Sequence, residues 1–213
     1  DIASVGIGSP GVIDPRNGVV EYWSNLDFHN VPLADMLKVR LGKEVYIEND
    51  ANAAALGEYA AGAGKGSHSM VAITLGTGVG GGLILGGRMF TGGKHQGVEL
   101  GHMPLVAGGI PCTCGNLGCI EAYCSASALG RAGAKAMKEH PKSLLFVRSD
   151  GNPDAIDAKL VVDCAKEGDK TATPVFNQYI YYLGSAFVSM IHLIEPEVIA
   201  RGGVLCKAGE FLF

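Results

Sequence analysis

Three cysteines crowded into one short segment constrain this chain more than any other feature of its sequence. Cys112, Cys114 and Cys119 form a C-x-C-x4-C pattern that contains two glycines, and His102 precedes it. Three thiolates and one imidazole are a common ligand set for a structural, tetrahedral Zn2+ ion, and glycines let a short loop fold back so that the sulfurs converge. We therefore predict a zinc site formed by these four residues. The alternative is a chance cluster of free thiols beside an ordinary histidine.

Two carboxylates flank the predicted metal loop. Glu99 lies three residues before His102, and Glu121 lies two residues after Cys119. Folding of the loop should therefore bring the two carboxylates together. A closed shell of four protein ligands leaves no position for a reactive water, so we expect the zinc to hold the loop in place. The same reasoning disfavours a zinc hydrolase.

These segments resemble a known signature. VELGH at 98–102 and CTCGNLGCIE at 112–121 are similar to the pattern of the ROK family (repressors, open reading frames and kinases), in particular its bacterial glucokinases. With the segments described below, the resemblance spans essentially all 213 residues. It implies zinc binding by the four predicted ligands and sugar contacts by Glu99, His102 and Glu121. Carboxylates and an imidazole N–H suit vicinal hydroxyls.

The charge and cysteine distributions exclude several classes of function. The net charge of −4 contains no long run of one sign, so the chain lacks a basic patch for nucleic acid. Its apolar runs fall short of the ~18 residues that span a bilayer, and no signal peptide is visible. The remaining cysteines, Cys124, Cys164 and Cys206, are scattered. Scattered thiols fit a reducing compartment, so we expect a cytoplasmic protein.

The N-terminal segment contains a misleading glycine pattern. Residues 2–8 read as a buried strand, and Gly6, Gly8 and Gly11 satisfy G-x-G-x-x-G. No helix follows, although a dinucleotide fingerprint requires one. The family resemblance implies instead that backbone near Gly8 approaches the sugar, and that Asn25 is a weaker candidate for a substrate contact. A plain strand and turn is the alternative. The pattern also predicts strands at 19–23 and 44–47 and a helix at 32–41.

A second decisive stretch surrounds Asp50. Asn49 and Asp50 end a predicted strand, and an alanine-rich helix follows them. A carboxylate at or near a helix N-cap is held in its ionised form, and capping alone is enough to explain such an aspartate. ENDANAAALGE at 48–58 resembles the glucokinase segment that carries a sugar-binding asparagine and a catalytic aspartate. The resemblance implies that Asn49 and Asp50 bind substrate and that Asp50 is the general base.

The predicted strand 70–75 runs into a glycine-rich turn at 76–82, and a further strand follows at 83–85. Exposed N–H groups and the Thr77 hydroxyl in such a hairpin can cradle phosphate oxygens. A glycine hairpin with no ligand is the alternative. The segment resembles the second phosphate loop of the actin, hexokinase and Hsp70 superfamily. This implies that Gly76, Thr77 and Gly78 bind ATP.

The C-terminal part is mostly helical. Helices are predicted at 125–140, where Ser125 is the cap, at 157–167 and at 173–194. The last of these helices has an apolar stripe that suits a core position. A strand at 197–200 leads to Gly202 and Gly203. The family usually has three glycines here, which line the adenosine, so we expect these two to contact the nucleotide. Arg201 takes the place of the first glycine, and the sequence does not explain it.

Interleaved strands and helices indicate an α/β fold. The resemblance implies the two-lobed actin-like ATPase (ribonuclease H-like) fold with an interlobe cleft. Residues 1–66 would be the remainder of the small N-terminal lobe, with the sugar-binding and catalytic-base segment. Residues 67–213 would be the large lobe, with the phosphate hairpin, the zinc loop and the helices. The chain starts without methionine and ends abruptly, so we expect a fragment of a longer protein.

The implied function is ATP- and Mg2+-dependent phosphorylation of a hexose, with glucose and its 6-hydroxyl first. The family's D-x-G-G-T phosphate loop is missing from these residues, so we expect this chain alone to be inactive. Family members are commonly homodimers or homotetramers. Two alternatives stay open: a sugar-sensing ROK repressor domain, and a kinase for mannose, fructose, allose or an N-acetylhexosamine.

Overall fold

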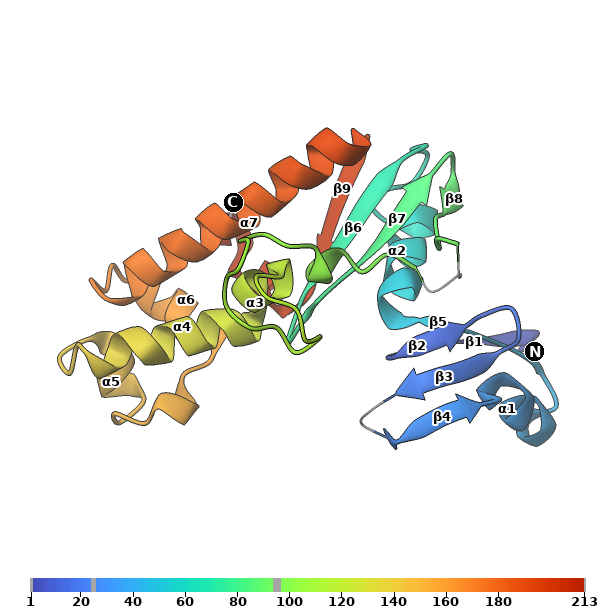
Figure 1. Ribbon diagram of the computed structural model, residues 1–213, viewed down its shortest axis with the longest axis horizontal. Coiled ribbons are helices and arrows are strands. Elements are labelled where there is room, and N and C mark those ends of the chain that lie inside the picture. Colours follow the sequence, from blue (N-terminus) through green and yellow to red (C-terminus); the bar gives the residue numbers. More distant parts are fainter. Residues whose placement is uncertain (1, 24–25, 94–96, 213) are drawn as a thin grey trace. The chain divides into compact units, whose positions relative to one another are not determined.

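The computed structural model describes residues 2–23, 26–93 and 97–212, so Asn25 lies outside the described residues. The chain forms two compact units, each described here by itself (Figure 1). The first unit comprises Asp1–Ile73, Gly81–Glu99 and Pro196–Ala200, and the second comprises Thr74–Gly80, Leu100–Glu195 and Arg201–Phe213. The division into lobes at 1–66 and 67–213 stays a prediction.

The first unit begins with a parallel pair of strands. β1 (Ser4–Ser9) lies beside β5 (Glu44–Asn49), and their register places Gly8 opposite Glu48. Because parallel strands end at the same edge, Gly8 and Asn49 both reach the carboxyl end of this pair.

An antiparallel sheet and a helix cover the same core. β2 (Val12–Asp14), β3 (Val19–Trp23) and β4 (Phe28–Val31) pair in the order β2-β3-β4, and α1 (Leu33–Leu41) follows. The helix ends where Gly42 adopts a left-handed conformation. The fully buried centre of this core consists of Ile13, Val20, Ala34, Val45 and Ile47.

A third sheet has the order β8-β7-β6-β9. Its strands are β6 (Met70–Leu75), β7 (Val79–Leu85), β8 (Arg88–Met89) and β9 (Val198–Gly202). In the first unit α2 (Asp50–Ala61) packs on this sheet through Ala55, which joins Met70 and Ile84 in one buried cluster.

Five α-helices belong to the second unit: α3 (Ile120–Cys124), α4 (Ala126–Lys138), α5 (Leu144–Arg148), α6 (Ala158–Lys166) and α7 (Ala172–Ile194). α4 packs against α6 and α7, and α3 also contacts α7. Ser125 and Asp157 cap α4 and α6 by accepting hydrogen bonds from backbone N–H groups one turn ahead. Among the described residues, no helix combines the length and apolar character that a membrane crossing requires.

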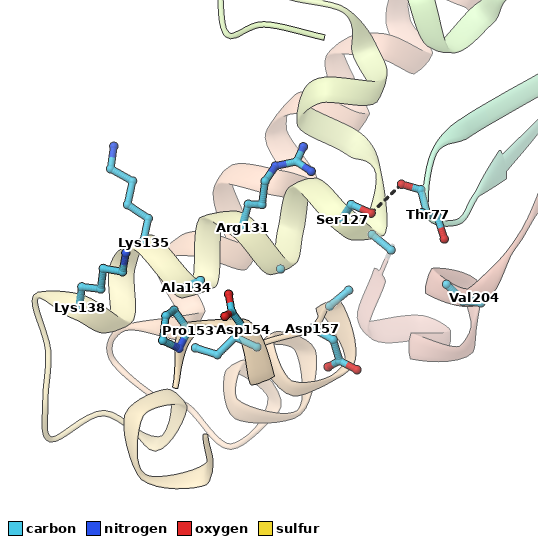
Figure 2. Close-up of a pocket in the computed structure, with 14 residues that line it drawn as sticks. Thr77, Ser127, Arg131, Ala134, Lys135, Lys138, Pro153, Asp154, Asp157 and Val204 are labelled. Atoms are coloured by element: carbon cyan, nitrogen blue, oxygen red, sulfur yellow. Dashed lines mark hydrogen bonds between the residues drawn. The ribbon is translucent and has the colours of Figure 1, made fainter. Parts of the chain in front are cut away.

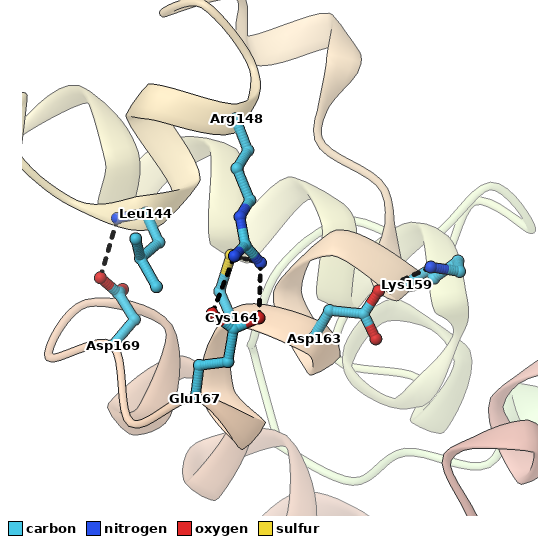
Figure 3. A network of polar contacts seen from close by, with 7 residues as sticks. All are labelled: Leu144, Arg148, Lys159, Asp163, Cys164, Glu167 and Asp169. Carbon is cyan, nitrogen blue, oxygen red and sulfur yellow. Dashed lines mark hydrogen bonds and ion pairs between the residues drawn. The ribbon is translucent and has the colours of Figure 1, made fainter.

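A polar network fastens α5 to α6 (Figure 3). The guanidinium of Arg148 donates two hydrogen bonds of 2.8 Å to the carboxylate of Glu167. Asp169 accepts a hydrogen bond of 2.9 Å from the backbone N–H of Leu144, at the start of α5. Arg148 holds the pKa of Glu167 below its usual range, because its hydrogen bond favours the ionised carboxylate.

The structure confirms most predicted elements within a few residues and corrects two details. The glycine-rich segment is mainly strand, since β7 begins at Val79 and only residues 76–78 form the turn. Glycine is needed at Gly82 because a Cβ atom there would overlap the side chain of Ala55 in α2. In α7 the apolar pattern places Ile180 and Phe187 in the buried stripe, but these two are only partly buried, and Tyr179 and Ala186 are buried in their place.

Candidate functional site

The four predicted metal ligands converge. The ligand atoms of His102, Cys112, Cys114 and Cys119 all lie within 4.8 Å of one another. His102 Nδ1 is 3.6 Å from Cys112 Sγ, and Cys114 Sγ is 3.6 Å from Cys119 Sγ. Tetrahedral zinc with its usual bond lengths separates two sulfurs by about 3.8 Å and a sulfur from a nitrogen by about 3.6 Å. The donor set and its spacing therefore fit one Zn2+ ion.

The metal loop, which runs from His102 to Cys119, is held together by short backbone contacts. The segment 104–106 runs beside Gly118 and Cys119, and the N–H of Leu105 donates to the Gly118 carbonyl at 2.7 Å. Gly118 has a φ of +78°, and a Cβ atom there would overlap the carbonyl oxygen of Val106. Only glycine fits at this close contact between two segments of the loop. The contact places Cys119 next to the other three predicted ligands.

The cysteine thiols differ in their surroundings. Burial raises the pKa of Cys119 to about 12, because a thiolate there would lose its hydration. A backbone hydrogen bond from Asn116 lowers the pKa of Cys114. A bound cation supplies the positive charge that a buried thiolate otherwise lacks, so metal binding and thiol deprotonation are linked in this loop.

Glu121 joins the metal loop to the turn after β6. It lies in the first turn of α3, and its Oε2 accepts a hydrogen bond of 3.0 Å from the backbone N–H of Val79. Its Oε1 accepts a hydrogen bond of 3.2 Å from the Thr113 hydroxyl and lies 3.7 Å from Cys112 Sγ. A Cβ atom on Gly78 would overlap Oε2, so glycine allows this close approach.

The turn at 76–78 is also fixed by the start of α4. The backbone N–H of Ala126 donates to the Gly76 carbonyl at 2.8 Å, and the Ser127 hydroxyl donates to the Thr77 carbonyl at 2.8 Å (Figure 2). Within the turn, the N–H of Gly76 donates to the Gly78 carbonyl at 3.0 Å. The Thr77 side chain is exposed. A fixed turn with an exposed hydroxyl is a suitable frame for an anion.

Two cavities meet at this turn. The larger, of about 600 Å³, extends from Thr77 along α4, with Arg131, Lys135 and Lys138 on one wall and Asp154 on the other (Figure 2). The smaller cavity, of about 490 Å³, is lined by residues of the turn, the metal loop and the starts of α3 and α4. Both volumes lie within the range of small-molecule sites.

Gly202 is the last residue of β9, and Gly203 follows it. Gly203 has a φ of +96°, and a Cβ atom there would overlap the backbone of Leu75 at the end of β6. A short 3-10 segment, Val204–Leu212, comes next, and Val204 lines the larger cavity. The chain therefore passes from the end of β9 to the wall of that cavity. The nucleotide contacts of Gly202 and Gly203 stay a prediction.

In the first unit, Asn49 rather than Asp50 caps α2. The side-chain oxygen of Asn49 accepts hydrogen bonds from the N–H groups of Ala51 and Asn52 at 3.0 and 3.2 Å. Asp50 is the first helical residue; it is exposed, and its Oδ1 accepts from the Ala51 N–H at 2.9 Å. Asn49 therefore occupies the capping position, and the Asp50 carboxylate shares the N–H of Ala51 with it.

Gly8 lies beside Asp50. A Cβ atom on Gly8 would be 3.3 Å from the Cα atom of Asp50, so the two residues are close neighbours. The sequence reasoning missed two supporting residues in this segment. Glu48 accepts hydrogen bonds from the Asn49 N–H at 2.9 Å and from the Asn52 side chain at 3.1 Å, and Asn52 is buried. Their signal was a polar pair four residues apart next to the predicted base.

The predicted site residues thus fall into two groups. The first unit holds Gly8, Asn49, Asp50 and Glu99, of which the first three lie together. The second unit holds the four predicted metal ligands, Glu121, the turn at 76–78, Gly202 and Gly203. Gly202 is also the last residue of β9. That Glu99 and Asp50 join His102 and Glu121 around one sugar stays a prediction.

A strand pair ending at a helix N-terminus, a strand–turn–strand unit with a glycine turn, and a Cys3His loop define an α/β protein of the actin-like ATPase class. The chain belongs to the ROK family, whose model matches residues 1–212. The fold predicted from the sequence is thereby confirmed.

Particular relatives are informative. The glucokinase of Thermotoga maritima is 45% identical over 98% of this chain and 66% of its own length. A crystal structure of a ROK family glucokinase from Streptomyces griseus in complex with glucose and AMPPNP has a TM-score of 0.88 at 36% identity, covering 100% of this chain and 69% of that one. A ROK transcriptional regulator homologous to Escherichia coli MLC has a TM-score of 0.87 at 30% identity, covering 99% and 52%. The chain spans about two thirds of the length of the curated glucokinases it matches.

Proposed function

We propose that the protein to which this chain belongs is an ATP-dependent sugar kinase that transfers the γ-phosphate of ATP to the 6-hydroxyl of glucose. The observation that carries the proposal is the exposed carboxylate of Asp50 at the start of α2, beside Gly8 and next to a cap supplied by Asn49. The carboxylate is exposed and therefore accessible, as a general base must be. The similarity to glucokinases supports the same reaction.

In this mechanism Asp50 accepts the proton of the sugar hydroxyl as that oxygen attacks phosphorus. The carboxylate lies in the first turn of α2, where it can act as a general base. Asn49 has its oxygen committed to the helix cap, while its Nδ2 donates to the Gly11 carbonyl at 3.3 Å. That contact holds the loop after β1 close to Asp50. Most of the rate enhancement would come from positioning of the reacting groups.

The nucleotide would lie at the turn 76–78. The N–H groups of Thr77 and Gly78 and the Thr77 hydroxyl would bind phosphate oxygens, and the larger cavity, which begins at Thr77, has room for the nucleoside. A bound Mg2+ ion would neutralise charge on the phosphates. Gly202 and Gly203 would approach the adenosine. AMPPNP in the Streptomyces griseus glucokinase supports an ATP site in this family.

The sugar would be held by Asn49, Glu99, His102 and Glu121. A zinc ion bound to His102 and the three cysteines would fix the imidazole in one tautomer, so that its other nitrogen faces a hydroxyl in a defined way. The metal would then be structural, with no step of the reaction passing through it. Glucose ranks first among the hexoses because Glu121 follows the third cysteine as in the glucokinase pattern.

A sugar-sensing repressor is the second candidate, because a ROK transcriptional regulator resembles this chain almost as closely in structure. The similarity to that regulator covers 99% of this chain. The complete set of Asp50 and sugar ligands favours the kinase, since a sensor needs no general base.

The test is ADP release by the full-length protein with Mg-ATP against glucose, mannose, fructose, allose and N-acetylmannosamine. We expect the highest kcat/KM with glucose. Folded, zinc-containing protein that turns over no sugar would contradict the kinase, and sugar-dependent DNA binding by the same preparation would establish the repressor. A higher kcat/KM for another hexose would keep the reaction class and change the substrate.

A further inference from the structure

We infer that Glu121 is a positioning residue that couples the metal loop to the turn at residues 76–78 (the phosphate turn), so that metal loading determines the affinity for nucleotide. The inference rests on the proposed function in one respect, namely that nucleotide phosphates bind at residues 76–78. It gives Glu121 a role that is separate from its proposed contact with the sugar.

The two oxygens of Glu121 face different parts of the unit. Oε2 accepts the hydrogen bond of 3.0 Å from the Val79 N–H, and Oε1 accepts that of 3.2 Å from the Thr113 hydroxyl. Thr113 stands between the metal ligands Cys112 and Cys114, so a bound metal fixes the position of its hydroxyl. One oxygen of the carboxylate therefore contacts the metal loop, and the other contacts Val79 at the end of the phosphate turn.

The turn has two kinds of anchor. Its entry is held by α4, through the hydrogen bonds that the Gly76 and Thr77 carbonyls accept. Its exit, at Val79, is held by Glu121. Of these anchors, only the last is joined to the metal loop. The N–H groups of Thr77 and Gly78 lie between entry and exit, so their directions depend on both ends being held.

Loss of the metal should therefore weaken nucleotide binding through this carboxylate. Without metal, the segment 112–114 loses the constraint that places Thr113, and Glu121 loses its second hydrogen bond. The carboxylate can then leave Val79, and the turn gains conformations that do not bind phosphate. A ligand that binds only the ordered turn loses affinity in proportion to the population of that state.

The test measures the Kd of Mg-AMPPNP for the full-length protein by calorimetry, without sugar, in four states: wild type and Glu121→Ala, each with zinc and after removal of zinc by a chelator. In wild type we expect chelation to weaken binding about tenfold, the size of one lost charge-assisted hydrogen bond. Zinc-loaded Glu121→Ala should be weakened to a similar extent. Chelation of this variant should add less than about a twofold effect, because coupled changes are not additive.

Two further variants separate positioning from folding. Glu121→Gln keeps an acceptor for the Val79 N–H and should restore the nucleotide Kd to within about twofold of wild type. Thr113→Val removes only the exposed hydroxyl donor and should weaken binding a few-fold with zinc still bound. Glu139→Ala, an exposed glutamate at the end of α4, serves as the control and should leave the Kd unchanged.

The outcomes distinguish the inference from the proposed function. If wild type binds AMPPNP and zinc-loaded Glu121→Ala binds it equally well, Glu121 acts on the sugar alone and the inference is wrong. Equal weakening of wild type and Glu121→Ala by chelation would also overturn it, because the metal would then act by another route. If wild type binds no nucleotide at all, the proposed function and the inference both fail.

Discussion

The carboxylate of Glu121 accepts a hydrogen bond from the backbone N–H of Val79 at 3.0 Å, although the two residues are 42 positions apart in the sequence. The contact links the helix that follows the metal loop to the strand that follows the phosphate turn. This hydrogen bond therefore connects the metal loop to the turn at residues 76–78.

Cys119→Ser should lower the zinc content from about one ion per chain to nearly none. A serine hydroxyl is a poor ligand for Zn2+ compared with a thiolate, and three remaining ligands do not close the shell. Zinc content measured on purified protein by atomic emission checks this. Cys206→Ser, the same change outside the cluster, should keep the metal. Full zinc content in Cys119→Ser would remove that residue from the site.

Gly118→Ala should destabilise the protein far more than Gly115→Ala. Both glycines have positive φ, +78° and +89°. A Cβ atom at Gly115 meets open space, so its cost is about 1 kcal/mol of left-handed strain. At Gly118 it overlaps the Val106 carbonyl, and we expect at least about 2 kcal/mol more. Urea unfolding of both variants measures the difference; equal costs would mean that the loop does not cross itself at Gly118.

Glu167→Gln should remove a pH-dependent part of the stability. Arg148 lowers the pKa of Glu167 in the folded state, so the pair stabilises the protein above the unfolded pKa of about 4.3, and this is lost as pH falls through the folded pKa. The stability difference between wild type and variant should therefore be present at pH 7 and shrink as the pH falls below the unfolded pKa and through the lower folded pKa. Both side chains are partly exposed, so the effect should be small and weakened by salt. A difference that does not change with pH would contradict the ion pair.

Arg131→Ala should weaken nucleotide binding. Among the residues that the structure describes, Arg131 is the one cation that lines both cavities meeting at Thr77, so it can reach phosphates on either side of the turn. We expect about a tenfold higher Kd for Mg-AMPPNP, with Arg131→Lys between the two. Lys142→Ala, at an exposed lysine that lines neither cavity, is the control. An unchanged Kd in Arg131→Ala would place the phosphates away from this side chain.

The convergence of His102 with Cys112, Cys114 and Cys119 could be predicted from the sequence because it depends on residue type and close spacing. The same holds for the turn at 76–78 and for most helices and strands, whose patterns are local. What escaped prediction depends on tertiary packing. The hydrogen bond from Val79 to Glu121 requires two distant segments to meet, and β7 runs through glycines because α2 packs on Gly82.

The place of Asp50 shows the same limit on a smaller scale. The sequence predicts a helix start at this point and places the Asp50 carboxylate at or near its cap. Backbone geometry decides, because Asn49 has the extended conformation of a cap and Asp50 is already helical. The buried contact between Glu48 and Asn52 likewise depends on the side chains that surround it.

The most direct test of the kinase account compares sugar binding with turnover in Asp50→Asn of the full-length protein. The account predicts that glucose binds with a Kd within a few-fold of wild type, because the amide preserves the shape of the site. It also predicts that kcat for ADP release falls by at least about a hundredfold, because the general base is gone. Turnover near the wild-type rate would show that Asp50 is not the base and would contradict the proposed mechanism.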